Sequence, residues 1–478
     1  MALNLVRNSR VFFTTNVDST TGVIASTGAT TSNTFEIQVL DGFTFSQNTN
    51  QETVTISEAG SAPVRGQRSF NTSLAPVDFS FSTYARPYNS GSAVTAEESV
   101  LWNALFGTTA ASTAAVTVGG TISGVTYAFS AGNGTVTIAG TSLTATGVAV
   151  GDTVTIGSIS TTSPAASNPY INAPAVVKTI SGTSITLDLV NPTTTATTIT
   201  TPASVKFYKS AWAPVSTGYS VVTAATSNSN QLQKFGMIFV VDSVAYAVDN
   251  AALNQVSIDF GLDAIATLAW TGQATALRQI DTALSGSTFT GAGFAGTAGA
   301  KNTAAGYITN KLSTVSLSLV NAIGAAAAGT TYAVALTGGS LTINNNINYI
   351  TPANLGVVNQ AVTYYTGTRA ISGTLNAYLK TGSGVGSTGQ LLSDMLAAAS
   401  ATIEPMVALN ISIGGGANTV KIVLDMPAAT ITIPTVDVQQ VVSTAINFTA
   451  QGYVPSSTAN GNVFDLSKTN DIAVRYYA

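Results

Sequence analysis

Few residues of this 478-residue chain could do chemistry, because it contains no histidine and no cysteine. It therefore lacks the commonest metal ligands, the usual general base and one of the strongest nucleophiles. Catalysis by carboxylates or lysine stays open, so the acidic residues are the ones to examine. Without cysteine there are no disulfide bonds, and the redox compartment cannot be inferred.

Two acidic pairs and one glycine run have spacings that could suit a site. Glu97 and Glu98 precede a helical pattern, where the helix dipole favours negative charge. Asp259 and Asp263 could both reach a cation, but no third oxygen-rich residue stands at loop spacing. The glycines at 414–416 lack the Lys-Ser/Thr of a phosphate loop and join two expected strands. We predict no catalytic, cofactor-binding or metal-binding residue, no cofactor, and no enzymatic activity.

The chain is organised around one stretch that it uses twice. An alternating, β-branched and aromatic run at 65–87 passes through a polar turn into the helical pattern AEESVLWNALFG at 96–107. The second copy runs from 366–384 into STGQLLSDMLAAAS at 387–400. Both helices have apolar residues at i, i+1, i+4 and i+5, which form one stripe on a helix. These residues are Leu101, Trp102, Leu105 and Phe106 in the first copy, and Leu391, Leu392, Met395 and Leu396 in the second.

The ends of the first helix and the strands around both helices can also be predicted. Thr95 and Glu98 indicate a capping box, and Gly107 indicates the helix end. Three strands are expected after each helix, within 234–274 and 417–453, and matching strands precede both copies.

We predict a mainly β fold with two tandem β-barrel or sandwich domains, each with a short packed helix. The first consists of 1–107 plus 212–281, and the second of 305–478. Between the first helix and its following strands, 108–211 forms short alternating strands with Gly-Asp and Ser-Gly turns. We interpret it as an inserted small β-barrel or Ig-like decorating domain. The Gly/Ala/Thr-rich segment 282–304 is predicted to be a linker.

The composition argues against membranes and nucleic acid as binding partners. Charged residues make up 8% of the chain and the net charge is −4, with no basic patch interleaved with aromatics. The longest apolar stretch, 315–336, is broken by Asn and Gly residues and alternates like strands, so we predict no transmembrane helix. The N-terminal MALNLVRNSRVFF has no long apolar core, and no signal peptide is predicted.

Two copies of a strand-rich unit leave sheet edges open unless a neighbour pairs with them. Copies arranged around an axis can close their sheets into one barrel, which removes those edges. The nearly uncharged composition suits surfaces buried against neighbours. Polar Asn/Gln tips at 46–51 and 344–348 suit hairpins that contact an adjacent ring.

The chain resembles the tail tube proteins of tailed bacteriophages. The resemblance is carried by the long strand ending in Tyr84-Ala85-Arg86, its turn into AEESVLWNALFG, their repetition at 366–396, and the opening ALNLVRNSRVFFT. It covers roughly 1–107, 212–280 and 305–478. It implies stacked β-barrel rings that form a hollow tube through which viral DNA leaves the capsid. A fused double tube domain implies trimeric rings with pseudo-sixfold symmetry.

The same resemblance implies partners and a location. The chain would self-associate and would contact tail terminators, a baseplate or tip, and a sheath where one exists. DNA would pass through the lumen without specific binding, and no membrane would be involved. The protein would belong to the virion tail and be assembled in the host cytoplasm.

The lumen should be lined by polar and acidic side chains, because basic contacts to DNA in every ring would hold the genome back. Asp242 and Asp425 are the first candidates for lumen-facing residues, since each follows an apolar pair at what looks like the same place in the two halves. An alternative role for both is to cap strand ends at the ring surface.

Two other classes of protein share part of this pattern. A secreted surface-layer or adhesin-type β protein would also be rich in Thr, Ser and Gly strands, although it should carry a secretion signal. A carboxylate-based hydrolase on a β scaffold would need two acidic residues in one cleft, and the sequence offers no such pair.

Overall fold

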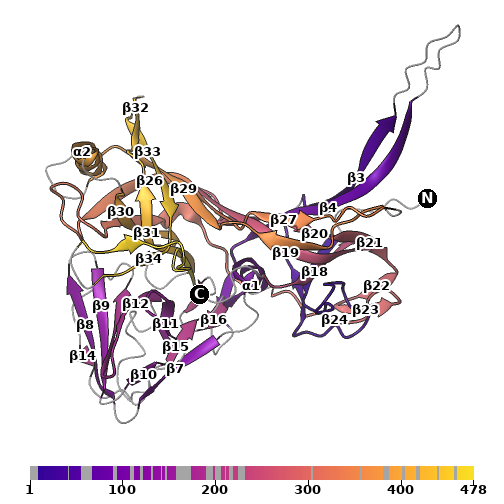
Figure 1. Cartoon of the computed structure of the whole chain (residues 1–478), viewed down its shortest axis with the longest axis horizontal. Coiled ribbons are helices and arrows are strands. Elements are labelled where there is room, and N and C mark those ends of the chain that lie inside the picture. The colour runs from indigo at the N-terminus through magenta and orange to yellow at the C-terminus, as the bar shows by residue number, and fades with distance from the viewer. Residues whose placement is uncertain are drawn as a thin grey trace, which may run out of the picture.

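The computed structural model is mainly β, with two short α-helices and one large antiparallel sheet beside several smaller ones (Figure 1). It describes residues 9–40, 42–54, 67–89, 94–107, 112–118, 122–130, 133–140, 143–145, 148–157, 174–189, 198–199, 206–209, 212–214, 219–223, 232–302, 305–355, 358–380, 387–400, 404–415, 420–438, 441–456 and 460–478. In this part of the chain, neither helix is long and apolar enough to cross a membrane.

The first half of the large sheet has a simple order of pairing. Its strands neighbour one another as β2-β1-β18-β19-β20-β4-β3, and β21 also pairs with β19. Helix α1 follows β4 in the chain. The bounds are β1 Ser9–Thr14, β2 Thr34–Ile37, β3 Thr44–Val54, β4 Arg68–Tyr84, α1 Ser99–Phe106, β18 Phe235–Val241, β19 Val244–Gly261, β20 Thr267–Ala274 and β21 Ala276–Ile280.

The second half repeats this order. Its strands pair as β26-β25-β30-β31-β33-β29 and return to β26, while β32 adds to β33 and β36 to β31. Helix α2 follows β29. The bounds are β25 Thr314–Leu319, β26 Thr331–Asn344, β29 Ala370–Tyr378, α2 Thr388–Ala398, β30 Met406–Gly414, β31 Lys421–Ile431, β32 Thr435–Asp437, β33 Ser443–Ala450 and β36 Ala473–Tyr477.

The repetition holds residue by residue along the central strand. Val248 lies opposite Met237 just before a bulge, and Met426 lies opposite Leu409 just before the corresponding bulge. Further along, Ser257 faces Ala269 and Thr435 faces Ala445. Both comparisons give the same offset of 178 residues (426 minus 248, 435 minus 257), so β19 corresponds to β31 followed by β32.

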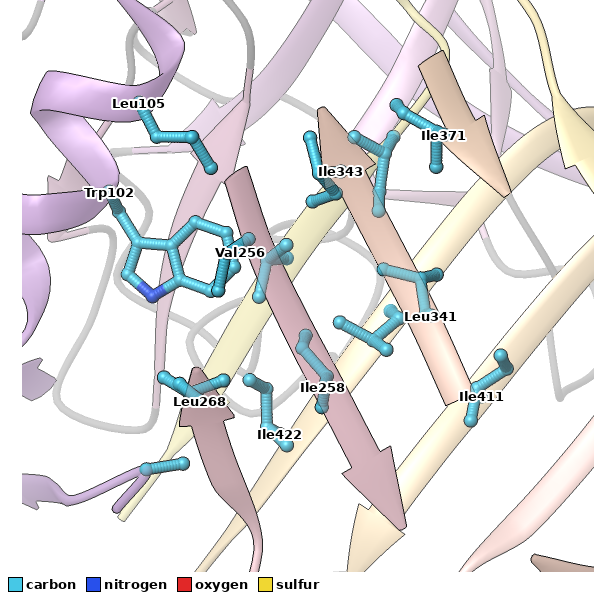
Figure 2. Close-up of a cluster of buried hydrophobic side chains, with 14 of the residues drawn as sticks. Trp102, Leu105, Val256, Ile258, Leu268, Leu341, Ile343, Ile371, Ile411 and Ile422 are labelled. Atoms are coloured by element: carbon cyan, nitrogen blue, oxygen red, sulfur yellow. The ribbon is translucent and has the colours of Figure 1, made fainter. Parts of the chain in front are cut away.

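The two halves are joined directly by backbone pairing. The second part of β19 pairs with β20 on one edge and with β26 on the other, from Gln255↔Asn344 to Gly261↔Gly338. Helix α1 lies over this junction. Its Trp102 Nε1 donates to the hydroxyl of Tyr476 on β36 at 2.7 Å. Leu105 and the strand residues of both halves then form one continuous core (Figure 2).

The ends of the two helices differ in how they are capped. Gly107 ends α1 with a left-handed backbone (φ 92°), as the sequence predicted. The predicted capping box at Thr95 is wrong: Glu98 is the N-cap residue, and its side chain makes no capping bond. In α2 the side chain of Ser387 accepts the backbone N–H of Gln390 at 3.1 Å.

A separate nine-stranded sheet is built within 112–209 and lies below the large sheet in Figure 1. Its strands are β7 Ser112–Val118, β8 Ile122–Ser130, β9 Asn133–Gly140, β10 Leu143–Ala145, β11 Thr153–Gly157, β12 Pro174–Ile180, β13 Ser184–Leu189, β14 Thr198–Ile199 and β15 Lys206–Lys209. It rests on the second half: Asn470 Nδ2 donates to the Gly151 carbonyl at 2.9 Å, and Val176 packs with Tyr453. After this sheet, the chain forms β16 Trp212–Pro214 and β17 Tyr219–Thr223, which pair with each other. β17 also pairs with the C-terminal strand β36.

The segment 282–304 carries more structure than its composition indicated. It contains a three-stranded sheet of β22 Thr282–Ser285, β23 Thr288–Gly291 and β24 Gly296–Thr297. Phe289 and Phe294 are buried against Phe12 and Ile238 of the first half. The connection between the halves is therefore packed onto one of them.

The remaining elements are short, apart from one long hairpin. β3 and β4 extend well beyond the sheet as a ribbon (Figure 1) whose β3 residues are exposed from Asn48 to Val54. Asn359 bridges to this ribbon, where its carbonyl accepts the backbone N–H of Leu74 at 2.7 Å. The other small elements are β5 Pro87–Asn89, β6 Val94–Ala96, β27 Ile347–Ile350, β28 Thr363–Thr366, β34 Tyr453–Val454, β35 Val463–Phe464 and the 3-10 turn Asn310–Leu312.

Candidate functional surface

One face of eight consecutive strands forms a continuous polar surface. The strands neighbour one another as β3-β4-β20-β19-β26-β29-β33-β32, and residues directly opposite one another share a face. One face enters the core. The opposite face consists of Thr44, Ser46, Asp78, Ser80, Ser82, Tyr84, Thr267, Ala269, Thr271, Gln273, Gln255, Ser257, Asp259, Ser340, Thr342, Asn344, Ala370, Ser372, Thr374, Asn376, Tyr378, Ser443, Ala445, Asn447, Thr449, Thr435 and Asp437.

This polar face carries mostly small or neutral polar side chains, with two tyrosines and three carboxylates, and none of its members is lysine or arginine. Its polar groups bond to each other across strands. Thr374 Oγ1 donates to Asn447 Oδ1 at 2.7 Å, and Gln273 Nε2 donates to Asp78 Oδ1 at 3.0 Å. Such pairs stabilise neighbouring strands by about 0.2–1 kcal/mol each. The face therefore offers no fixed cation to an anion.

Asp259 and Asp437 occupy the same place in the two halves. Asp259 faces Thr267 and Asp437 faces Ser443, and the two residues differ by the offset of 178 that relates the strands (437 minus 259). Both are exposed on the polar face. From the sequence, Asp259 was considered with Asp263 as a possible cation site, and Asp437 was not singled out. Strand pairing, which fixes register, is the signal that identifies them.

The predicted pair Asp242 and Asp425 is not brought together in this way. Asp242 lies in the turn between β18 and β19, partly exposed and with a left-handed backbone (φ 55°). Asp425 lies within β31, where the 178-residue offset relates it to Ala247 instead. The match by letters was thus out of register. A lumenal position for Asp242 stays a prediction.

The expectation for Asp425 needs correction on physical grounds. Its side chain is fully buried and accepts hydrogen bonds from Arg475 Nε at 2.5 Å and Arg475 Nη2 at 2.9 Å, and from Asn410. A carboxylate enclosed in this way has no surface to present to a lumen. Its role in the chain is to fix β36 against β31.

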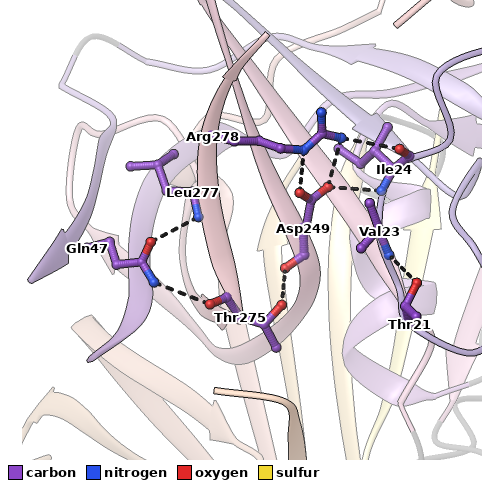
Figure 3. A network of polar contacts seen from close by, with 8 residues as sticks. All are labelled: Thr21, Val23, Ile24, Gln47, Asp249, Thr275, Leu277 and Arg278. Carbon is purple, nitrogen blue, oxygen red and sulfur yellow. Dashed lines mark hydrogen bonds and ion pairs between the residues drawn. The ribbon is translucent and has the colours of Figure 1, made fainter. Parts of the chain in front are cut away.

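A second buried carboxylate does the same for the first half. Asp249 accepts Arg278 Nε at 2.6 Å and the backbone N–H of Ile24 at 2.9 Å (Figure 3). Beside it, the Gln47 amide bonds to the backbone of Thr275 and Leu277, linking β3 to β21. Arg278 and Arg475 lie on β21 and β36, the strands that add to β19 and β31. In each half, an arginine–aspartate pair thus fixes the added strand to the central strand.

The acidic pair at the start of α1 is structural. Glu97 pairs with Arg86 at 3.0 Å and accepts the backbone N–H of Asn302 at 2.7 Å. Glu98 is fully buried, where it accepts the backbone N–H of Arg86 at 3.0 Å and is hydrogen-bonded to Tyr476. Burial raises the pKa of Glu98 to about 7. These contacts tie the helix to both halves.

No described part of the chain gathers three or more acidic residues in a way that could hold a metal ion. Asp263, considered with Asp259 as a cation site, instead pairs with Lys311 at 3.1 Å on the surface. The glycines at 414–416 fall at the end of β30, and only Gly414 and Gly415 lie within the described residues.

Comparison with known proteins agrees with the resemblance seen in the sequence. No protein-family model matches the chain. It is 23% identical over 474 residues to the tail tube protein pb6 of Escherichia phage T5, an alignment that covers 97% of this chain and 75% of that protein. A match over this length includes both halves and the segment between them. Over nearly its whole length, the chain is therefore similar in sequence to a phage tail tube protein.

Proposed function

We propose that this chain builds the stacked rings of a phage tail tube and that viral DNA leaves through their lumen. The observation that carries the proposal is the polar face, which runs without interruption across eight strands and both halves of the chain. A surface that DNA slides along should not bind phosphate, since each lysine or arginine contact adds salt-dependent affinity. The polar face carries carboxylates and no basic side chain.

We infer that residues 1–107 with 212–281 and residues 305–478 are two tandem tube domains. The support is the recurring order of strand pairs and the constant offset along the central strand. Three chains would then place six equivalent domains around an axis. Closing a sheet on itself removes its edges, which is the usual way for a β structure of this kind to avoid open-ended pairing.

In this arrangement the polar face lines the lumen, and Asp78, Asp259 and Asp437 are its charged members. Asp242 lies outside that face, in a hairpin turn. The helices are on the opposite, core-facing side of the sheet, where Trp102 and Leu391 are buried. They would therefore lie toward the outside of the ring.

We further propose that 108–211 is an inserted domain on the outside of the tube. The support is its own nine-stranded sheet, and its position against β34 and the loop around Lys468 and Asn470. Other tail proteins would bind at the ends of the stack, as terminators or as the baseplate or tip.

Electron microscopy of the purified protein at rising concentration tests the function. Stacked rings with an open centre are expected, and averaged images should show three chains per ring with pseudo-sixfold symmetry. Flat lattices would favour a surface-layer protein. Particles that stay monomeric at all concentrations would contradict the tube.

A further inference from the structure

We propose that the edge of β32 pairs with the edge of β3 from a second copy of this chain, in the register that joins the two halves internally. The inference rests on the proposed ring and adds the strands and residues that meet. In antiparallel pairing Thr435 lies opposite Ser46 of the neighbouring copy, and Val436 lies opposite Phe45.

The template is the junction inside the chain. There β19 residues 255–261 pair with β26 residues 338–344. β32 corresponds to residues 257–259 of β19 by the offset of 178. Residue 44 corresponds to residue 340, because Ser80 and Thr374 pair with them at equivalent positions of β4 and β29. Applying both relations to Ser257↔Thr342 gives Thr435↔Ser46.

In the single chain, both proposed strands lie at the edge of a sheet. Among the described strands, β32 pairs with β33 alone and β3 pairs with β4 alone. Each therefore has a backbone edge that could add a strand. Pro434, which has no N–H, immediately precedes β32, so the new pairing begins at Thr435.

Side-chain burial shows that this edge is covered in the first half and exposed in the second. Ile258 is 0% exposed and Phe260 is 2% exposed, because β26 and the second half lie against them. Their counterparts Val436 and Val438 are 43% and 78% exposed. Apolar side chains that are buried at the internal junction are thus exposed at the position where a second copy would supply the same cover.

The helices give a second, independent sign of the missing neighbour. Trp102 and Phe106 of α1 are buried at the internal junction, with Arg369 of the second half 5.9 Å from the Phe106 ring. In the matching apolar pattern of α2, Leu396 is 56% exposed. A neighbour joined through β32 would lie against this side of α2 and bury it.

The contact is between two different surfaces, so it is head-to-tail. Such contacts close into a ring or continue as a filament, depending on the rotation between copies. The internal junction sets that rotation, because the new junction repeats its geometry. One chain supplies one internal and one external junction, which then alternate around the ring.

Paired cysteines test the register, because the natural chain has none. Thr435→Cys with Ser46→Cys should give disulfide-linked multimers on oxidation, since directly opposite residues have Cα atoms about 4.5–5.5 Å apart, within disulfide range. The matched control Ser257→Cys with Thr342→Cys should link only within one chain. Thr435→Cys with Thr44→Cys places the thiols diagonally and should link at most one-tenth as efficiently.

Microscopy of the same samples separates this inference from the proposed function. Rings that form without the 435–46 link, or that link better through the diagonal pair, overturn the pairing and leave the tube intact. A chain that never assembles overturns both.

A charge placed on the edge provides a second measurement. Val436→Lys should raise the protein concentration needed for assembly by about tenfold or more, because a lysine on this edge would be buried at the junction. Val23→Lys is the control, since Val23 is equally exposed at 42% and lies away from both edges. Equal assembly by the two variants would contradict the proposed contact.

Discussion

Glu98 should make the folded chain less stable as the pH rises through neutrality. It is the buried N-cap of α1, held between the backbone N–H of Arg86 in the first half and the hydroxyl of Tyr476 in the second. No basic side chain contacts its carboxyl in the hydrogen bonds and ion pairs of the described residues. Replacing it by glutamine leaves a group of the same shape that mimics the protonated acid.

The size and sign of the effect follow from the pKa of Glu98. The pKa is about 7 in the folded chain, against an ordinary value of 4.5. Because the pKa of Glu98 is higher in the folded chain than in the unfolded chain, the folded chain holds the Glu98 proton to higher pH. The stability that protonated Glu98 contributes is therefore fully present below pH 4.5 and is lost as the pH rises toward and through 7. A difference of about 2.5 pKa units corresponds to about 3 kcal/mol. Glu98→Gln should match the natural chain at pH 4.5 and exceed its free energy of unfolding by about 3 kcal/mol at pH 8.

Urea unfolding followed by tryptophan fluorescence measures this directly, since Trp102 and Trp270 are both buried beside the site and contact one another edge-on. Other carboxylates titrate equally in both proteins, so the difference between them isolates Glu98. Glu52→Gln makes the same chemical change on the exposed hairpin and should follow the natural chain at every pH. A gap between Glu98→Gln and the natural chain that is the same at pH 4.5 and pH 8 would refute the reasoning.

Three further outcomes are expected. Asp425→Ala should lower the free energy of unfolding by about 3–5 kcal/mol in urea titrations, because it leaves Arg475 buried without its partner; a loss below about 1 kcal/mol would show that the pair is not the clasp of β36. Removing 108–211 and bridging Gly107 to Trp212 with a short Gly/Ser linker should leave ring assembly intact in electron microscopy, and failure to assemble would place the insert in the barrel or its interface. Asp259→Lys with Asp437→Lys should leave rings intact but make tubes retain duplex DNA at low salt and release it as salt rises, whereas Asp18→Lys with Asp465→Lys, the same charge change at exposed turns, should not.

The repeated strand-and-helix unit could be predicted from sequence because its signals are local. Apolar spacing at i, i+1, i+4 and i+5 placed both helices, and Gly107 marked the end of the first. Tyr84, named as a strand end, and Tyr378, which ends the strand of the repeated copy, occupy equivalent places: each is opposite the corresponding end of its partner strand, at Thr267 and Ser443. Alternation over a long strand is hard to mimic by chance.

The lumen candidates could not be predicted because they depend on register. Letters aligned Asp242 with Asp425, but a turn of different length precedes each strand, and pairing relates Asp425 to Ala247. A shift of one residue moves a side chain to the other face of a sheet. Burial then decides the outcome: Asp425 enters the core and needs an arginine, while Asp259 and Asp437 stay on the polar face.

The composition of 282–304 did not reveal that this connection is packed onto the first half, for a related reason. Glycine and alanine suit a flexible linker, yet they also allow close packing: a Cβ added at Gly296 would lie 2.2 Å from the Ala29 carbonyl oxygen. The two phenylalanines in this segment carried the informative signal, since large apolar side chains need a core. Small residues around them let the backbone approach the first half.

The proposed duplication also accounts for the places where the two halves differ. At the internal junction, both sides belong to the same chain, so large side chains always meet the same neighbour. Trp102, Phe106 and Phe260 lie there, and all three are buried. At the edge proposed to meet a separate copy, the counterparts are smaller: Val438 stands where Phe260 does, and Leu396 where Phe106 does. Smaller apolar side chains expose less surface before assembly, which limits non-specific association. The asymmetry is what a subunit needs if it must remain dispersed until a ring forms.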